Sequence, residues 1–293
     1  MLIQTNLPAP ELRIAVAGAT GRVGSHLIKQ LSSDSVELIS LTRQKVPEST
    51  SDKIASVVVD FDKPSTLETG LRGADKLFIA HGTSPQQVAN EIALIDAAVK
   101  TGVRHIVKLS VMGPATPLNP FAWHAVIEAH LAQQSVASTV LRPTTFMDVL
   151  KRAGSHVTTG TWAGAAGHGR VNLIDSRDVA DVARAALLEK VAEHSRRAYH
   201  LTGSHNWTMH EVAEELSRLL GYTISYFDRS PEEQRTALLA EGLSPFVADL
   251  LLGLDRIFNQ SVLKERTLTV EELTGSPPRE LSGWLKENIE LFR

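Results

Sequence analysis

Three glycines near the start of the chain are spaced three residues apart. The run from Gly18 to Gly24 reads GATGRVG, with an apolar strand pattern just before it and a helical pattern beginning inside it. Glycines at such a junction permit a tight turn and let backbone N–H groups approach a pyrophosphate, to which the helix N-terminus adds partial positive charge. The GxxGxxG spacing alone is weak evidence for a nucleotide-binding site, and a plain tight turn is the alternative interpretation. Its place in a strand–turn–helix unit favours a dinucleotide site, for which we predict these contacts: Gly18, Thr20, Gly21, Arg22, Val23 and Gly24.

The end of the second predicted strand indicates which dinucleotide is bound. A site for NAD(H) has Asp or Glu about 20 residues after the glycines, where the acid accepts from the ribose 2′-hydroxyl. This chain instead has Arg43 there, followed by Lys45, and the next acid is Glu48. A guanidinium can bind a 2′-phosphate through two hydrogen bonds and stack on adenine, and Lys45 and Arg22 add positive charge. We predict NADP(H) as the preferred cofactor; NAD(H) stays an alternative, as does a solvated loop role for Arg43.

The residues that follow the other strands are further candidates for this site. Ligands of open α/β sheets bind in a crevice at the carboxyl ends of the strands. We therefore predict that the following residues face the cofactor: Asp60, Phe61, Ala80, His81, Gly82, Ser110 and Pro143.

The elements that must position these residues alternate between strand and helix through the first two-thirds of the chain. Short apolar runs predict strands at 13–17, 37–42, 56–60, 76–80, 105–109 and 138–141. Helical patterns lie between them at 22–31, 65–71, 86–100 and 121–134. This alternation is typical of βαβ units, which build a parallel sheet covered on both faces. We predict an α/β protein with a doubly wound Rossmann sheet.

The pattern changes near residue 150. Segment 154–170 is rich in Gly, Thr and Ala and has no clear period, which predicts a loop or a ragged hairpin. A strand, a helix and a strand are then predicted at 171–174, 178–189 and 199–202. From about residue 204 the chain is mostly helical, with a single strand predicted at 223–227.

Helix start signals mark this last part of the chain. Capping boxes predict helix starts at Thr208 and Thr269, and Ser230 followed by Pro231 predicts a third. We predict a Rossmann domain formed by residues 1–150 plus 171–203. A smaller, mostly helical cap for the substrate would comprise residues 151–170 plus 204–293.

The composition excludes several function classes. The chain has 293 residues, of which 30 are basic and 33 acidic, so its net charge is −3. This balance lacks the excess of basic residues that binding to nucleic acid or to an anionic membrane requires. It has no cysteine, which removes disulfides, thiolate catalysis and Cys-bound metals. No HExxH motif occurs, and His200, His205 and His210 fall on different predicted elements, so we expect no metal site.

No segment suggests export or membrane insertion. Residues 1–11 lack a cationic region followed by an apolar stretch, and the first apolar run, 12–17, is far shorter than the ~20 residues of a membrane span. We expect a cytoplasmic protein. No pattern identifies a subunit interface, and a homodimer is left open.

Several strings together resemble one family. They are VAGATGRVG at 16–24, DFD at 60–62, DAAVKTGV at 96–103, HIVKLS at 105–110, LRPT at 141–144, DVA at 178–180 and EELTGSPPR at 271–279. The sequence is similar to NmrA-like members of the atypical short-chain dehydrogenase/reductase superfamily, of the quinone-reductase and triphenylmethane-reductase type. The resemblance spans about residues 12–292. It implies a Rossmann domain, NADP(H) binding and a small C-terminal cap over the substrate cleft.

Ordinary short-chain dehydrogenases use a Tyr and a Lys four residues later, on the helix after the fifth strand. Here the only tyrosines, Tyr199, Tyr222 and Tyr226, lie downstream of that helix. The corresponding stretch holds His124 and Glu128, four residues apart and so on one helix face. We predict that His124 donates or relays a proton and that Glu128 orients it. The alternative is an ordinary helix histidine beside a solvated glutamate.

Ser110 is the second catalytic candidate. It ends the fifth predicted strand, where it can hydrogen-bond a substrate oxygen or merely cap the next turn. Aromatic side chains could form a flat wall for an aromatic substrate, although such residues more often serve packing: Phe121, Trp123, Phe146 and Trp162, with Phe246 from the cap.

A quinone lowers the demand for a strong acid, because hydride addition gives a hydroquinone anion that aromaticity already stabilises. We predict an NADPH-dependent reductase that transfers hydride directly to a quinone or a similar planar aromatic compound, polyketide-type compounds included, without flavin or metal. The main alternative is a non-catalytic NADP(H) redox sensor of the NmrA type, which the missing Tyr–Lys pair favours. A third is an isomerase or reductase of another small metabolite, such as an ether-linked phenolic.

Overall fold

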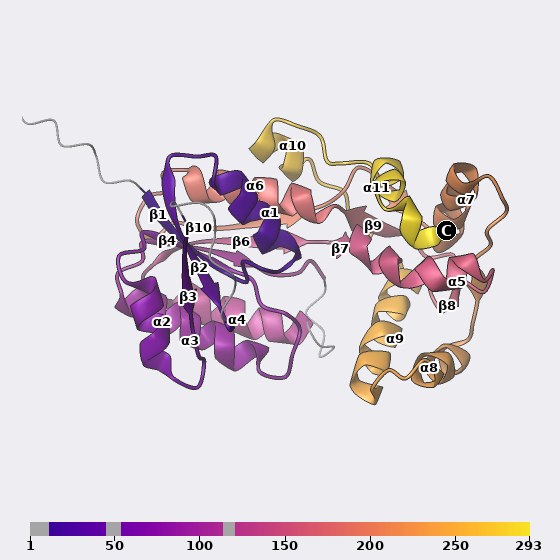
Figure 1. Cartoon of the computed structure of the whole chain (residues 1–293), viewed down its shortest axis with the longest axis horizontal. Coiled ribbons are helices and arrows are strands. Elements are labelled where there is room, and N and C mark those ends of the chain that lie inside the picture. Colours follow the sequence, from indigo (N-terminus) through magenta and orange to yellow (C-terminus); the bar gives the residue numbers. More distant parts are fainter. Residues whose placement is uncertain (1–11, 45–53, 114–120) are drawn as a thin grey trace, which may run out of the picture. The chain divides into compact units, whose positions relative to one another are not determined.

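The computed structural model describes residues 12–44, 54–113 and 121–293 (Figure 1). Lys45, predicted to add positive charge to the cofactor site, lies outside the described residues. The chain divides into two compact units, and the first consists of Met1–Ser110, Val126–Leu141 and Ala180–Ala198. The second consists of Val111–Ala125, Arg142–Val179 and Tyr199–Arg293.

The first unit is built around a seven-stranded sheet with the order β10-β6-β5-β4-β1-β2-β3. Its strands are β1 Leu12–Ala17, β2 Val36–Thr42, β3 Ile54–Val58, β4 Lys76–Ile79, β5 His105–Leu109, β6 Ala137–Pro143 and β10 Arg196–Leu201. Neighbouring strands from β3 to β6 pair in parallel. The chain winds outward in one direction from β1 and in the other from β4, which confirms the predicted doubly wound α/β fold.

Helices cover both faces of this sheet. They are α1 Arg22–Leu31, α2 Pro64–Leu71, α3 Gln87–Lys100, α4 Phe121–Gln133 and α6 Ser176–Leu188. Helices α2, α3 and α4 lie on one face and α1 and α6 on the other (Figure 1). Helices α2, α3 and α4 bury Leu67, Ile95 and Ile127, respectively, against Ala15 and Leu77 of the sheet. Each helix is held to the sheet by one apolar stripe, and the spacing of the residues in that stripe is what predicted the helix.

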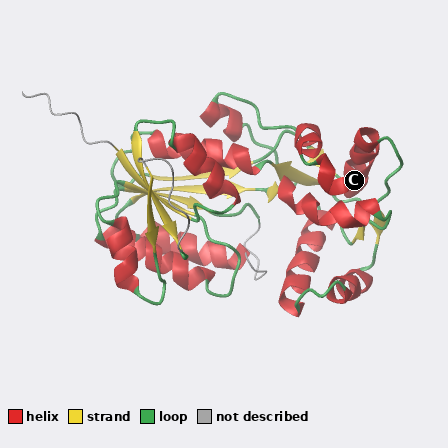
Figure 2. Ribbon diagram, in the orientation of Figure 1, coloured by secondary structure: helices red, strands yellow, loops and turns green. Residues whose placement is uncertain are grey.

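The second unit is mostly helical (Figure 2). Its helices are η1 Met147–Ala153, α5 Gly154–Thr158, α7 Met209–Leu220, α8 Pro231–Ala240, α9 Pro245–Asn259, α10 Thr269–Thr274, α11 Leu281–Glu287 and η2 Ile289–Phe292. Short strands complete it: β7 Thr145–Phe146, β8 Ala163–Gly164, β9 Val171–Ile174, β11 Asn206–Trp207 and β12 Phe227–Asp228. Its core gathers Leu216, Trp284, Leu285 and Phe292, all buried.

The boundary of the two units differs from the predicted one. Segments 111–125, 142–150, 171–179 and 199–203, assigned from the sequence to the cofactor domain, belong to the second unit. For 142–150 and 171–179 the reason is strand pairing: β9 pairs with β7 and β11 in a separate three-stranded sheet, not with the seven-stranded sheet.

Three local predictions in this part of the chain were wrong. Segment 154–170 contains α5, whose first residue, Gly154, packs so closely on Leu291 that an added Cβ would lie 2.2 Å from the Leu291 carbonyl oxygen. At 223–227 only Phe227 is in a strand, because the hydroxyl of Ser217 bonds both backbone groups of Ile224. The helix at Thr269 begins after Leu268 without a side-chain cap.

The helix starts at Thr208 and Ser230 were predicted correctly. Each hydroxyl accepts from the backbone N–H three residues later, and the glutamate there accepts in return. None of the helices in the described part of the chain is long and apolar enough to cross a bilayer.

Candidate functional site

The glycine turn after β1 is as tight as its sequence predicts. Gly18 has a φ of +81°, and a Cβ there would lie 2.3 Å from the carbonyl oxygen of Ala80. The Gly21 N–H donates to the Gly18 carbonyl oxygen at 2.9 Å, and a Cβ on Gly24 would lie 2.1 Å from the same oxygen. The three glycines thus bring β1, β4 and the first turn of α1 to contact distance.

The N-terminus of α1 is suited to an anion. Gly21 is its N-cap, with no side-chain cap, and the first turn holds no acid. Thr20, Gly21 and Arg22 are exposed there, whereas Val23 and Gly24 are buried beneath them. The first N–H groups of a helix lack intrahelical acceptors and carry partial positive charge, so the pyrophosphate of a dinucleotide fits this turn.

Strand register brings the predicted residues of the first unit to one edge of the sheet. Ala17 lies beside Leu41 on one side and Ile79 on the other, and Ile79 lies beside Lys108. The residues that follow these positions therefore emerge at the same edge, and β1 and β4 are the pair where the strand order reverses. A reversal point of this kind is where open α/β sheets bind dinucleotides.

Two of the predicted cofactor residues meet at this edge. The rings of Phe61 and His81 pack edge-on with centroids 6.0 Å apart. His81 is fixed further, because Nδ1 lies 2.6 Å from the Gly82 carbonyl oxygen and Nε2 lies 3.0 Å from the side-chain nitrogen of Asn90. The loop after β4 is therefore tied to α3 before any ligand binds.

The side chains of Asp60 and Arg43 differ in their contacts within the protein. Asp60 begins the turn into α2: its carboxylate accepts from the Asp62 N–H at 3.0 Å and its Oδ2 lies 3.3 Å from Lys63 Nζ. Arg43 is exposed just after β2. Asp60 thus has a structural role that was not predicted from its place at the end of a strand, while the phosphate contact of Arg43 stays a prediction.

The catalytic candidates show a bond that was not predicted. Ser110 is buried just after β5, and its hydroxyl donates to Glu128 Oε1 on α4. Its backbone N–H donates to the Leu141 carbonyl oxygen at 2.7 Å. His124 is half-buried one turn earlier on α4. Glu128, predicted from the sequence to orient His124, thus accepts a hydrogen bond from Ser110. Its role in orienting His124 stays a prediction.

Two of the five aromatic residues predicted to form a wall, Phe121 and Trp162, are buried in the core of the second unit. Trp162 also lines a pocket of that unit, and Phe146 is half-buried in β7. Trp123 and Phe246 differ: their rings stack with centroids 6.3 Å apart, and Phe246 is 42% exposed. Pro143, the last residue of β6, accepts from the Met112 N–H at 2.8 Å through its carbonyl.

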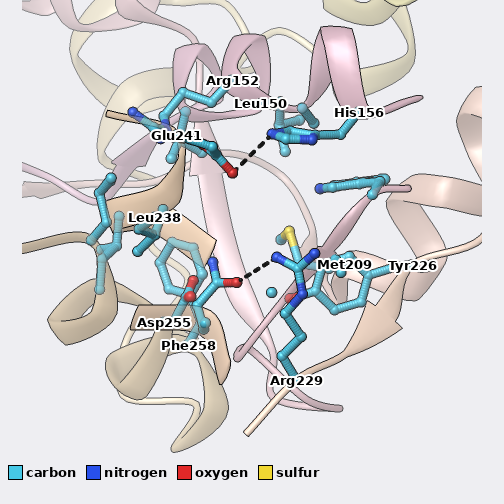
Figure 3. Close-up of a pocket in the computed structure, with 18 residues that line it drawn as sticks. Leu150, Arg152, His156, Met209, Tyr226, Arg229, Leu238, Glu241, Asp255 and Phe258 are labelled. Atoms are coloured by element: carbon cyan, nitrogen blue, oxygen red, sulfur yellow. Dashed lines mark hydrogen bonds and ion pairs between the residues drawn. The ribbon is translucent and has the colours of Figure 1, made fainter. Parts of the chain in front are cut away.

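The second unit contains a pocket with about 710 Å³ of empty volume, part of it open to solvent (Figure 3). Leu150, Leu238 and Phe258 contribute apolar surface to it. Its polar groups form pairs: Arg229 donates to Gln234 Oε1 at 3.1 Å, and Glu241 lies 3.4 Å from His156 Nε2. This pocket was not predicted, because its lining comes from elements that are distant along the chain.

Asp255 is a half-buried acid in the lining of that pocket. Burial raises the pKa of its carboxyl to about 6, against hydrogen bonds from the Ala165 N–H and the Gln234 side chain that favour the charged form. The Ala165 N–H donates to Oδ2 at 3.2 Å. The carboxyl is therefore held where its protonation changes near pH 6.

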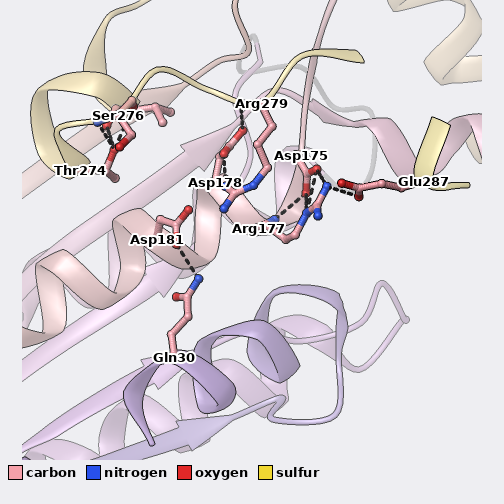
Figure 4. Close-up of polar contacts among 10 residues, drawn as sticks. Gln30, Asp175, Arg177, Asp178, Asp181, Thr274, Ser276, Arg279 and Glu287 are labelled. Atoms are coloured by element: carbon pink, nitrogen blue, oxygen red, sulfur yellow. Dashed lines mark hydrogen bonds and ion pairs between the residues drawn. The ribbon is translucent and has the colours of Figure 1, made fainter. Parts of the chain in front are cut away.

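A cluster of ion pairs lies at the start of α6 and joins two of the sequence strings that resemble the family, those at 178–180 and 271–279 (Figure 4). Asp178 accepts from the Arg279 backbone N–H at 2.9 Å and from its guanidinium. Burial raises the pKa of Asp178 to about 6, although Arg279 opposes the shift. Beside it, Arg177 bridges Asp175 at 2.6 Å and Glu287 at 2.7 Å. Asp178 of the string at 178–180 and Arg279 of the string at 271–279 thus contact each other.

Comparison with known proteins places the chain in a family. A family model described as NAD(P)H-binding matches residues 18–190. An NAD(P)H azoreductase from Xenophilus azovorans is 30% identical over 284 residues, covering 95% of this chain and 99% of the relative. The chain belongs to the NAD(P)H-binding family. A (4-alkanoyl-5-oxo-2,5-dihydrofuran-3-yl)methyl phosphate reductase from Streptomyces griseus is 33% identical, with the same coverages of 95% and 99%.

Solved structures share the fold of this NAD(P)H-binding protein. The NADPH complex of a quinone oxidoreductase from Escherichia coli has a TM-score of 0.85 at 24% identity, covering 94% of this chain and 99% of that one. Triphenylmethane reductase from Citrobacter has a TM-score of 0.86 at 22% identity, covering 95% and 100%. The predicted NmrA-like reductase type is confirmed, and the protein is an NAD(P)H-dependent oxidoreductase.

Proposed function

We propose that this protein is an NADPH-dependent reductase of quinones or similar planar conjugated compounds. The observation that carries the proposal is the carboxyl edge of the seven-stranded sheet, where an open helix N-terminus for a pyrophosphate and the buried Ser110–Glu128 pair occur in one unit. Relatives are named for an azo compound, a quinone and a dihydrofuranone phosphate. Azo compounds and quinones share a conjugated system that accepts two electrons.

We assign a separate role in the reaction to each of the candidate residues. Bound NADPH supplies a hydride, which carries two electrons to the substrate, and the product anion then needs one proton. His124 donates that proton, a role that suits an imidazole near neutral pH. Ser110 and Glu128 are positioning residues, because their hydrogen bond fixes the middle of α4 to the end of β5. We assign substrate recognition to the second unit, through the Trp123–Phe246 pair and the pocket.

The test is NADPH oxidation, followed at 340 nm without added flavin, on a panel of benzo-, naphtho- and anthraquinones. We expect acceptor-dependent turnover, with His124→Ala lowering kcat by about 10-fold and leaving the Kd of NADPH unchanged. Glu128→Gln, which keeps an oxygen for Ser110, should retain activity that Glu128→Ala loses. Tight NADPH binding without turnover on any acceptor would instead support the redox sensor.

Arg43 carries the proposed preference for NADPH over NADH. Arg43→Ala should weaken NADPH binding by about 1–3 kcal/mol, through loss of its hydrogen bonds to the 2′-phosphate, and leave NADH binding nearly unchanged. Titration of both cofactors by fluorescence measures this. Arg72→Ala is the control, because Arg72 is equally exposed but precedes a strand of the same sheet. Equal losses for the two cofactors would contradict the assignment.

A further inference from the structure

Three side chains that commonly bind metals meet in the second unit, and the proposed reaction uses none of them. His168, His210 and Asp228 each offer a ligand atom, and these atoms all lie within 4.8 Å of one another. The two imidazoles are stacked, with centroids 4.5 Å apart and planes inclined by 15°. Both rings present Nε2 to the same oxygen of Asp228.

The spacing of these atoms fits a bound cation better than direct hydrogen bonds. Nε2 of His210 lies 3.5 Å from Asp228 Oδ2, and Nε2 of His168 lies 3.9 Å from it. Hydrogen bonds between such groups are about 2.7–2.9 Å long. Two ligand atoms about 2.0–2.2 Å from one tetrahedral ion are instead roughly 3.4 Å apart. Stacked imidazoles direct their nitrogen lone pairs in parallel, so the His168 ring must rotate out of the stack for both rings to bind one ion.

Two of the three ligands are fixed by the fold. His210 lies in the first turn of α7, directly after the Thr208 capping box, and its ring packs edge-on against Tyr226 at 5.2 Å. Asp228 is in β12, which pairs with β8 and is extended by a bond from the Arg229 N–H to the Gly164 carbonyl oxygen at 2.8 Å. Such preorganised ligands lose little freedom on binding an ion.

The third ligand can adjust. His168 stands between two glycines, and its side chain is 84% exposed. Its loop is anchored after it, where the Arg170 N–H donates to Ser261 Oγ at 2.9 Å and a Cβ on Gly169 would lie 1.9 Å from the Phe258 carbonyl oxygen. The ring can therefore rotate toward the other two ligands while the loop stays in place.

We propose that His168, His210 and Asp228 form a binding site for a divalent transition-metal ion of the zinc class. Two imidazole nitrogens and one carboxylate oxygen suit Zn²⁺, Co²⁺ or Ni²⁺, whereas Mg²⁺ and Ca²⁺ prefer oxygen ligands alone. Three protein ligands leave a fourth position for water or another donor. The ion links the loop after β8, the first turn of α7 and β12.

No metal was expected from the sequence, because no HExxH motif occurs and the evenly spaced His200, His205 and His210 fall on different predicted elements. The structure separates them: His200 lies 3.3 Å from Glu265, and the ring of His205 packs against Trp207 at 4.9 Å. His210 instead meets residues 42 positions before it and 18 positions after it, a spacing that matches no short metal motif.

The test uses the full chain, freed of any affinity tag and treated with chelator. Calorimetric titration with Zn²⁺ should give one ion per chain, and Co²⁺ should produce the visible absorption of a four-coordinate site. His168→Ala should weaken Zn²⁺ binding by at least ~10-fold, and because His168 is exposed the variant should fold normally. Asp228→Asn, which keeps the side-chain shape, should also weaken binding.

His200→Ala is the matched control, because His200 pairs with a carboxylate in the same unit outside the cluster. This variant should bind Zn²⁺ like the unmodified protein. In addition, Zn²⁺ should raise the melting temperature of the unmodified protein but not of His168→Ala. The proposal is overturned if no stoichiometric binding occurs, or if His168→Ala binds as tightly as His200→Ala.

Discussion

Gly24→Ala is expected to weaken NADPH binding by about 100-fold or more while the chain still folds. The new Cβ would lie 2.1 Å from the Gly18 carbonyl oxygen and 2.8 Å from its carbon, so the turn or α1 must move. Either movement displaces the N–H groups that we assign to the pyrophosphate. Folding should persist, because alanine is a better helix former than glycine and α1 is held by its buried leucines.

The control for this variant is Gly283→Ala. Gly283 is an exposed glycine within α11, and an added Cβ meets nothing within 4 Å. It should bind NADPH normally and gain about 0.5–1 kcal/mol in the free energy of unfolding. Fluorescence titration with NADPH and urea unfolding monitored by circular dichroism measure the two effects. If Gly24→Ala binds NADPH as tightly as Gly283→Ala does, the turn is not the pyrophosphate site.

Breaking the buried Lys108–Glu91 ion pair is expected to cost about 3–5 kcal/mol of the free energy of unfolding. Lys108 Nζ lies 2.8 Å from Glu91 Oε2, and both side chains are almost fully buried. Gln87 donates to the other carboxylate oxygen at 2.9 Å, and the ammonium also donates to the Leu109 carbonyl oxygen. Lys108→Ala leaves the Glu91 carboxylate charged and buried without its ammonium partner.

Two comparison variants make this measurement decisive. Lys100 and Glu68 form an exposed pair 2.6 Å apart, so Lys100→Ala should cost no more than about 1 kcal/mol. The double variant Lys108→Met with Glu91→Gln removes both charges and keeps an acceptor for Gln87, so it should regain most of the lost stability. Urea unfolding gives all three values. Equal costs for Lys108→Ala and Lys100→Ala would contradict the assignment of a desolvated pair.

The features that the sequence predicted well are local ones. The bounds predicted for α1, 22–31, match the structure, and the strands at 105–109 and 171–174 were also predicted without error. The spacing of its own apolar residues is enough to predict a strand or helix of this kind. The glycine turn was equally predictable, because Gly21 and Gly24 make their close contacts with Gly18 in the same short run, although Gly18 itself lies against Ala80 of another strand end.

What the sequence did not predict depends on residues brought together from afar. Glu128 shares a helix face with His124, which suggested that pairing, but nothing in the local pattern indicated that Ser110, 18 residues earlier, donates to Glu128. Phe121 was a candidate for a substrate wall, with packing as the alternative, and its ring fills the space beside Gly113, where an added Cβ would lie 2.1 Å away. Short helices such as α5 lack a full apolar period, so only tertiary packing reveals them.

The interleaving of the two units constrains how the protein can be made. The chain crosses from one unit to the other five times, and the first unit is incomplete until residue 198. A ribosome therefore cannot finish the cofactor unit before it begins the other, as it can for domains arranged end to end. Until β10 is synthesised, β6 is the open edge of the nascent sheet, free to pair with another chain. A gene cut near residue 150 would release that edge permanently and yield an aggregating fragment rather than a separate cofactor domain.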